Sequence, residues 1–287
     1  MKQFLSRPLL AVCLLTCWGL QAHAQATLKR IDERGQINVG HRESSVPFSY
    51  LDNNQQPVGY SIDLCLKIVD EVKKKLGKDI KIQFVPITTA NRIPQITSGA
   101  IDMECGTTTI TLGRLEQLDF SMPFWITGTQ IAVPKKSRVA QAEDLKGKTV
   151  GVLQGSSNER ALQKLSQEKQ LNLKFNYVKD YAEGFLSLET NRIDALAGDG
   201  TPLAVFAATK SRRPQDFAVV GRLLTSDPYG VMFQRADAEF RLLVNRALAK
   251  AFESGEAERL LNKHFASTGV KASPDLLALY RAQSLPD

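Results

Sequence analysis

A threonine-rich segment and the arginine that follows it carry the most distinctive polar chemistry of the chain. The segment "GTTTITLGR" spans residues 106–114 and follows the apolar stretch "AIDMEC" (100–105). A guanidinium is planar and can donate two parallel hydrogen bonds to a carboxylate, which suits Arg114 to holding one. The alternative is an exposed arginine beside threonines that merely cap a helix. The residues alone leave both interpretations open.

Other polar side chains also follow apolar segments of the chain. Arg42 ends "INVGHR", Arg92 begins a short predicted helix, and Asp199 lies in "AGDG" after an apolar run. The start of a helix also favours an anion, which adds to the case for Arg92. Arg42 as a surface residue and Asp199 as a turn residue beside Gly200 are the simpler alternatives. A shared site requires a fold that brings these segments together.

Strand and helix patterns alternate along the chain, which predicts an α/β fold with parallel strands and right-handed crossovers. The predicted strands cover residues 37–42, 80–87, 100–105, 148–153, 173–178 and 193–198. The predicted helices cover residues 61–76, 91–99, 158–170, 182–191 and a long tail, 239–265. Open α/β sheets bind ligands at the carboxyl ends of their strands, where the polar segments fall.

The β-α-β-α-β pattern occurs twice, which predicts two α/β lobes with a ligand cleft between them. Two extended segments, 129–135 and 226–233, are the expected hinge crossovers between the lobes. We therefore expect lobe one to contain residues 25–128 and 234–287, and lobe two residues 136–225.

The first 24 residues have the three-part pattern of a secretory signal peptide. Lys2 and Arg7 precede the short apolar run "LLAVCLLTCWGL", and "AHA" (22–24) is a small-x-small cleavage site. The apolar run is short for a bilayer span, which disfavours a membrane anchor. The sequence therefore predicts an exported protein, in a bacterial periplasm.

Composition and charge exclude several classes of protein. Hydrophobic residues make up 43% of the chain and charged residues 23%, which is typical of a globular protein. The net charge of +7 is scattered, and "KKK" (73–75) ends a predicted amphipathic helix without interleaved aromatic residues. This pattern disfavours nucleic-acid binding, while a mildly positive protein suits an acidic small ligand.

Two cysteines, Cys65 and Cys105, remain after the predicted cleavage. Two thiols without metal-spaced partners make a poor zinc site, so we expect no metal. An oxidising compartment permits a disulfide between them, and two buried thiols are the alternative.

Several segments together resemble a known family. They are "HRESSVPFSYLDNNQQPVGYSIDL", "PITTANRIPQITSG", "IDMECGTTT", "DLKGKTVGVLQGSSNE", "DPYGVMFQR" and "SGEAERLLNKHF". The chain resembles the periplasmic amino-acid-binding proteins of ABC transporters, which have the type II fold. Within them it is most similar to the glutamate/aspartate-binding proteins, and the resemblance covers essentially the whole mature chain.

The resemblance implies how the common part of an amino acid is held. Arg114 and Thr109 would bind the α-carboxylate. Asp199 would bind the α-ammonium, with Thr107 supplying an oxygen where the family often has serine.

The resemblance also implies a second anion site for the side chain of an acidic ligand. Arg42, Arg92 and the hydroxyl of Thr89 match family positions for the distal carboxylate. Tyr181 stands where the family can carry a histidine, so this position donates a hydrogen bond but no positive charge. This substitution leaves the order of preference between glutamate and aspartate open.

The expected partners are L-glutamate or L-aspartate and the permease of an ABC transporter, and the expected state is a monomer without a cofactor. A binder of another polar amino acid is one alternative. A cyclohexadienyl-type dehydratase on the same fold is another, with Glu43 or Glu104 as the acid or base. His41 adjoins Arg42 but has no evident serine or cysteine partner for a catalytic triad.

Overall fold

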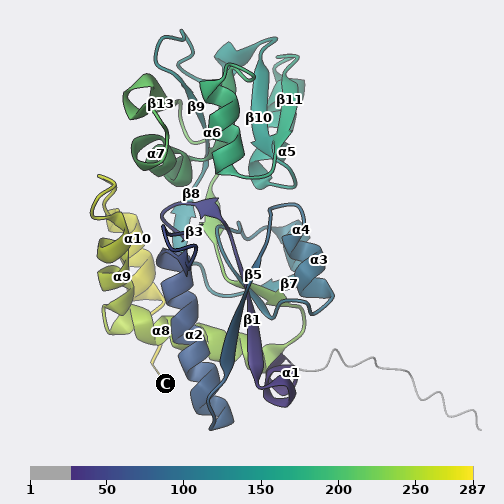
Figure 1. The fold of residues 1–287 in the computed structure, drawn as a ribbon, viewed down its shortest axis with the longest axis vertical. Helices are drawn as coiled ribbons and strands as arrows, with labels where there is room; N and C mark the ends of the chain where they lie inside the picture. The colour runs from purple at the N-terminus through teal and green to yellow at the C-terminus, as the bar shows by residue number, and fades with distance from the viewer. Residues whose placement is uncertain (1–26, 287) are drawn as a thin grey trace, which may run out of the picture.

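The computed structural model describes residues 27–286, which form two α/β units one above the other (Figure 1). Each unit is built around a five-stranded sheet. The α/β fold class predicted from the alternating pattern is confirmed. The predicted signal peptide, residues 1–24, lies outside the described residues.

The first sheet has the strand order β5-β1-β6-β15-β7. Its strands are β1 (Gln36–His41), β5 (Lys81–Pro86), β6 (Met103–Cys105), β7 (Leu118–Phe120) and β15 (Met232–Gln234). β1 is parallel to both β5 and β6, whereas β15 runs antiparallel to β6 and β7. The carboxyl ends of three parallel strands therefore meet at one edge of the sheet.

Helices cover both faces of the first sheet. They are α1 (Thr27–Arg34), α2 (Tyr60–Leu76), α3 (Arg92–Thr97), α4 (Leu112–Leu115), α8 (Ala238–Glu253), α9 (Glu256–Phe265) and α10 (Pro274–Ala282). The largest apolar core joins α2, α8, α9 and α10 to one face of the sheet, and a smaller core lies under α3. The single tail helix predicted over 239–265 is divided, because the chain turns at Gly255 with φ of 68°.

The second sheet has the strand order β11-β10-β12-β9-β13. Its strands are β9 (Thr129–Pro134), β10 (Thr149–Leu153), β11 (Lys174–Val178), β12 (Ala195–Asp199) and β13 (Phe217–Val220). The helices of this unit are α5 (Ser157–Glu168), α6 (Tyr181–Glu189) and α7 (Gly200–Thr209), with short 3₁₀ turns η1 (Ala142–Leu145) and η2 (Pro214–Asp216). Each face of this sheet has its own apolar cluster. One cluster contains residues of α6 and α7, and the other contains residues of α5.

A two-stranded antiparallel pair carries the chain between the sheets. It consists of β8 (Trp125–Thr127), which precedes β9, and β14 (Asp227–Tyr229), which precedes β15. The outgoing crossover was predicted at 129–135, but residues 129–134 pair with β12 and β13 inside the second sheet. Gly128 lies between β8 and β9, where the chain leaves the first unit. A side chain does not fit there, because a Cβ would lie 2.1 Å from the carbonyl oxygen of Thr225.

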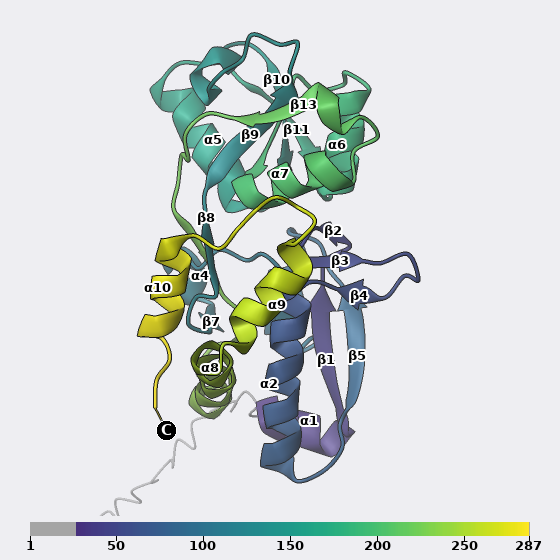
Figure 2. The same ribbon diagram turned by 90° about the vertical axis from the view of Figure 1, so that its left-hand side faces the viewer.

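Two smaller features lie where the units meet. A three-stranded sheet, β2 (Ser44–Ser45), β3 (Ser49–Leu51) and β4 (Pro57–Val58), follows β1 in the chain. The segment between α9 and α10, yellow in Figure 2, reaches the second unit near α7. Its residue Val270 packs against the apolar clusters of both units, so the C-terminal tail bridges them.

A disulfide joins Cys65 on α2 to Cys105 at the end of β6, and their Cα atoms are 6.2 Å apart. It ties the helix to the strand that precedes the threonine-rich segment. Within residues 27–286, none of the helices has the length and apolar character needed to cross a membrane.

Candidate ligand-binding site

A small cavity lies between the two units, at the carboxyl ends of the parallel strands. The residues that line it are Arg42, Thr89, Arg92, Thr107, Thr109, Leu153, Ser156, Ser157, Asn158, Tyr181 and Asp199. Seven of the eight ligand-binding residues predicted from the sequence are in this set, and Arg114 is the exception. Residues far apart in the sequence thus surround one polar space.

Arg114 lies beside the cavity rather than in its lining. Its Nη1 donates a hydrogen bond of 2.6 Å to the carbonyl oxygen of Thr109, in the same unit. Its Nη2 donates to the carbonyl oxygen of Gly155, in the second unit, at 3.3 Å. Arg114 therefore links the two units behind one wall of the cavity, and its Nε has no hydrogen-bond partner among the described residues.

The threonines of the 106–114 segment divide their roles by position. Thr107 and Thr109 line the cavity. Thr108 points elsewhere and accepts a hydrogen bond of 2.6 Å from Nη1 of Arg92. Thr111 caps α4 by accepting a hydrogen bond from the backbone nitrogen of Arg114. The capping role considered in the sequence analysis is therefore found at Thr111, whereas the alternative of an exposed Arg114 is wrong, because Arg114 is 4% exposed.

Three arginines are buried close together around the cavity. Arg42, Arg92 and Arg114 are between 2% and 4% exposed. Burial, together with the positive charge of the neighbouring Arg114, lowers the pKa of Arg92 to about 9, and the negative charge of Glu104 opposes this shift. Burial likewise lowers the pKa of Arg114 to about 10, and burial also lowers the pKa of Arg42.

These guanidinium groups keep unused donors. Nη2 of Arg42 and Nε of Arg92 make no hydrogen bond to any described residue. The hydroxyl of Thr89, which also lines the cavity, has no partner within residues 27–286 either. Buried donors without partners are costly, so the cavity favours a solute with anionic acceptors. α3 has only six residues, so the attraction comes from the side chain of Arg92 and owes little to the helix.

The opposite wall of the cavity carries one carboxylate. Asp199 ends β12, is 5% exposed, and accepts a hydrogen bond of 2.9 Å from Nδ2 of Asn158. Burial raises the pKa of Asp199 to about 6. Its backbone nitrogen donates to the hydroxyl oxygen of Tyr181 at 3.1 Å, which leaves the phenolic hydrogen available to another acceptor. The cavity therefore has a cationic side and an anionic side.

The sequence reasoning missed the residues that the second unit supplies at the start of α5. Ser156 caps this helix by accepting a hydrogen bond from the backbone nitrogen of Glu159. The hydroxyl groups of Ser157 and Thr109 lie 3.0 Å apart and connect the two units across the cavity. The pattern Ser-x-x-Glu at 156–159 is a helix-start signal that could have identified this wall.

The two carboxylates considered for an enzyme do not line this cavity. Glu43 forms an ion pair with Lys179 of the second unit at 3.3 Å, and both side chains are partly exposed. Glu104 is fully buried behind the cavity lining. Among residues 27–286 there is also no group of three histidine, cysteine or acidic side chains that could hold a metal ion.

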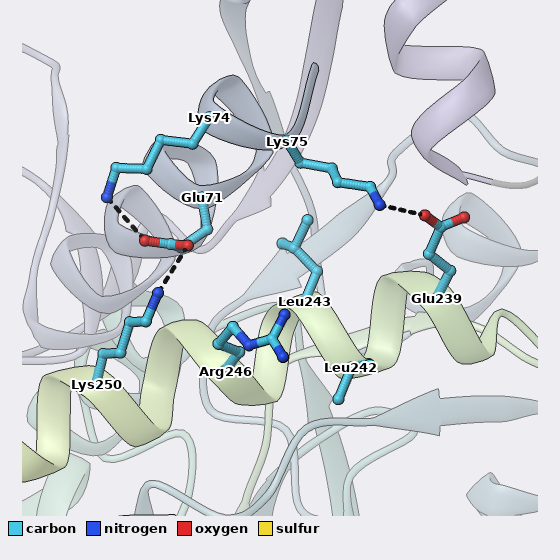
Figure 3. A pocket seen from close by; sticks show the side chains of 8 residues that line it. All are labelled: Glu71, Lys74, Lys75, Glu239, Leu242, Leu243, Arg246 and Lys250. Atoms are coloured by element: carbon cyan, nitrogen blue, oxygen red, sulfur yellow. Dashed lines mark hydrogen bonds and ion pairs between the residues drawn. The ribbon is translucent and has the colours of Figure 1, made fainter. Parts of the chain in front are cut away.

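A larger groove lies between α2 and α8, away from this cavity, and is lined by residues on those two helices (Figure 3). Its acidic side chains are already paired with lysines. Glu71 binds Lys74 at 2.8 Å and Lys250 at 3.3 Å, and Glu239 binds Lys75 at 2.9 Å. Because its lysines are paired with acidic side chains and it lies away from the ends of the parallel strands, this groove is not the candidate ligand site.

Comparisons with known proteins identify the family of the chain. The model of the bacterial extracellular solute-binding proteins, family 3, matches residues 37–267. The chain is 39% identical to the glutamate/aspartate import solute-binding protein of Salmonella typhimurium, over 90% of this chain and 88% of that protein. It is 40% identical to the protein of the same name from Escherichia coli, over 84% of this chain and 80% of that one.

A solved structure with a similar fold is that of the solute receptors for L-cysteine of Neisseria gonorrhoeae. Its TM-score to this chain is 0.75, and the two sequences are 26% identical. The match covers 88% of this chain and 98% of the receptor. With its two-lobed α/β fold and a family match over residues 37–267, the chain belongs to family 3 of the bacterial extracellular solute-binding proteins.

Proposed function

We propose that this protein captures L-glutamate or L-aspartate outside the cytoplasm and delivers it to the permease of an ABC transporter in the inner membrane. The observation that carries the proposal is the grouping of Arg42, Arg92 and Arg114 opposite Asp199 around one cavity. An acidic amino acid has two carboxylates and one ammonium, and this is the arrangement of charge that such a solute needs. The import proteins of Salmonella typhimurium and Escherichia coli, whose names specify glutamate and aspartate, support it.

The common part of the amino acid would lie between Arg114 and Asp199. The α-carboxylate would accept hydrogen bonds from Arg114, Thr109 and the start of α5, where Ser157 lies. The start of a helix offers backbone amides that lack intrahelical partners. Asp199 would pair with the α-ammonium, and Thr107 would supply an oxygen to it. Any α-amino acid presents these groups, so this part of the site does not select among them.

The distal carboxylate would select the acidic ligands. Arg42 and Arg92 have unused donors, and the hydroxyl of Thr89 lies in the same lining. Tyr181 can add one hydrogen bond through its phenolic hydrogen, without adding positive charge. These donors suit a carboxylate and mismatch the NH₂ group of an amide side chain.

Closure of the two lobes would follow from contacts that one ligand makes to both of them. β8 and β14 would serve as the hinge, because they are the strands that carry the chain between the sheets. A ligand shifts an open–closed equilibrium only through a difference in affinity between the two states. Arg42, Arg92, Thr107 and Thr109 from one lobe and Asp199 from the other would provide that difference.

A binding role fits the site better than a dehydratase. A general acid or base must come within hydrogen-bond reach of the reacting group. Glu43 is paired with Lys179 and Glu104 lies behind the lining, so neither is placed for that task. The proposed location is the periplasm, and the proposed state is a monomer without a cofactor.

We expect calorimetry of ligand-stripped protein to show binding of L-glutamate and L-aspartate at least about tenfold to a hundredfold tighter than L-glutamine. Mismatched buried donors cost roughly 1–3 kcal/mol, which corresponds to that ratio. L-Glutamine is the matched control, since it differs from L-glutamate only in the amide. Equal affinity for both would refute the acidic-ligand proposal.

We also expect the affinity for L-glutamate to fall as the pH falls through about 6. The pKa of Asp199 is raised to about 6, so below this pH the empty site holds a proton that the ammonium must displace. The dissociation constant should be steady from about pH 7 to pH 8 and rise towards tenfold per unit below about pH 6. The side-chain carboxyl of the ligand ionises near pH 4 and contributes little in this range.

Calorimetry over this pH range on the wild type and on Asp199→Asn tests the assignment. The variant should bind weakly, and its affinity should not change between pH 7 and pH 5. A wild-type affinity that is flat over the same range would remove Asp199 from the ammonium site.

A further inference from the structure

Glu104 is a buried carboxylate for which the proposed binding mode gives no role. It lies at the centre of β6, between Met103 and Cys105, whose side chains belong to the core of the first lobe. Side chains alternate along a strand, so Glu104 points away from that core. It is 0% exposed, and neither carboxylate oxygen has a hydrogen-bond partner within residues 27–286.

The carboxylate of Glu104 lies against the turn that positions the threonine-rich segment. A Cβ added to Gly106 would lie 2.2 Å from Oε1 of Glu104 and 3.1 Å from Cγ of Arg42. Gly106 is therefore packed between the two side chains, and the absence of a Cβ permits this approach. Glu104 thus lies immediately behind the arginine cluster, out of contact with the cavity itself.

Glu104 acts on all three arginines by charge. It is the leading source of electrostatic attraction that raises the pKa of Arg42, of Arg92 and of Arg114, against the lowering caused by burial. Asp199 also acts in this way on all three. No hydrogen bond joins Glu104 to these arginines among the described residues, so its effect on them is electrostatic rather than a matter of orientation.

Three guanidinium groups and two carboxylates leave one net positive charge around the cavity. The other charged neighbours largely cancel. Arg160 and Asp227 both act on Arg114 with opposite signs, and Asp180, which acts on Arg42, is paired with Lys179 at 3.7 Å. L-Glutamate and L-aspartate carry a net charge of minus one at neutral pH, so they neutralise this site.

We propose that Glu104 sets the net charge of the site at plus one and thereby matches it to a solute of net charge minus one. This inference rests on the proposed binding of an acidic amino acid. Glu104 repels the carboxylates of the solute through the low-dielectric interior, and the repulsion increases with the negative charge of the solute. Glu104 is thus a specificity-determining residue that acts against dianions and restrains the affinity for the acidic ligand.

The test is Glu104→Gln, which removes the charge and keeps the shape of the side chain. Three solutes of similar length differ in net charge: glutarate at minus two, L-glutamate at minus one and L-glutamine at zero. We expect the affinity of the variant to rise by about tenfold or more for glutarate and about threefold or more for L-glutamate, with less than about twofold change for L-glutamine. Calorimetry, with L-glutamate displacement for weak solutes, gives the three dissociation constants.

The controls separate charge from shape. Glu104→Met removes the charge and introduces no polar group that would need a hydrogen-bond partner. If Glu104→Gln does not fold, Glu104→Met should show the same ranking of affinity gains, with glutarate first, L-glutamate second and L-glutamine last. Glu104→Asp keeps the charge and should keep the wild-type order of affinities for the three solutes. Asp119→Asn removes a partly buried carboxylate on β7 that pairs with Arg241, and should change all three affinities by less than about twofold.

The results decide between a charge-setting and a structural role. A uniform loss of affinity for all three solutes in Glu104→Gln and Glu104→Met would overturn the inference, because a structural residue affects every ligand alike. Unchanged affinities would overturn it too. If wild-type protein binds none of the three solutes, the proposed function fails and this inference fails with it. If the wild type prefers acidic ligands as proposed and the Glu104 variants have the same affinities as the wild type, only the inference about Glu104 is refuted, and the proposed function stands.

Discussion

Replacing Arg114 with alanine is expected to weaken the binding of L-glutamate and L-glutamine alike, by at least about thirtyfold. Arg114 would hold the α-carboxylate that both ligands share, and it also joins the carbonyl oxygens of Thr109 and Gly155 across the two lobes. Truncating one partner of a buried charge pair costs on the order of 2–5 kcal/mol, and about 1.4 kcal/mol is a factor of ten. Calorimetric titration of both ligands measures the effect.

Arg160 offers a matched control for this substitution. It is an exposed arginine on α5 whose charge acts on Arg114, and Arg160→Ala should change both affinities by less than about threefold. Arg114→Lys keeps the charge but loses the planar pair of donors, so it should fall between the wild type and Arg114→Ala. Affinities of Arg114→Ala within threefold of the wild type would show that the guanidinium only ties the lobes together.

Much of the fold could be predicted because the parallel strands are short, apolar and separated by helices with one apolar face. The predicted strand over 80–87 is β5, and the helix over 61–76 is α2, which ends where Gly77 takes a φ of 66°. Such signals are local, since burial on one side fixes the periodicity of the sequence. The order of the strands and the pairing of β15 with β6 depend on distant segments and were not predicted.

Some of the missed elements lack a local signal, although α10, which begins with the Ser273 cap and Pro274, does carry one. α7, "GTPLAVFAAT", is apolar on nearly all sides, so it has no helical periodicity to recognise. The outgoing hinge was placed too late, because the apolar residues of β9 continue an extended pattern that begins in β8 without a visible break. The pairing of β8 with β14, which defines the crossing, joins segments about a hundred residues apart.

The site shows the same division between local and distant information. Arg42, Thr107 and Asp199 follow strands that the sequence predicts, and the fold brings their ends together at one cavity. Sequence spacing gives the distance of Arg114 from its strand but not the side from which it approaches, so its place behind the lining was not foreseen. The unpartnered state of Glu104 depends on every element packed around it, and a sequence pattern contains no trace of it.

Replacing Arg92 with alanine is expected to weaken the binding of L-glutamate by about thirtyfold or more and the binding of L-glutamine by less than about threefold. Arg92 is 3% exposed, lines the cavity, and keeps an unused Nε, so its guanidinium is placed to meet the distal carboxylate. A buried charge pair of this kind loses on the order of 2–5 kcal/mol when one partner is truncated. An amide side chain gains little from a guanidinium, so the ratio between the two ligands should narrow. Calorimetric titration of wild type and variant gives this ratio.

Thr108 provides the control that separates charge from anchoring. Its hydroxyl accepts the hydrogen bond from Nη1 of Arg92 at 2.6 Å, and Thr108→Val removes that contact while leaving the guanidinium in place. This variant should retain most of the preference for L-glutamate, because the positive charge remains beside the cavity. Equal losses for both ligands in Arg92→Ala would mean that Arg92 holds the 106–114 segment in position. The selection of acidic ligands would then depend on Arg42, the other guanidinium in the cavity lining, whose Nη2 has no partner among the described residues.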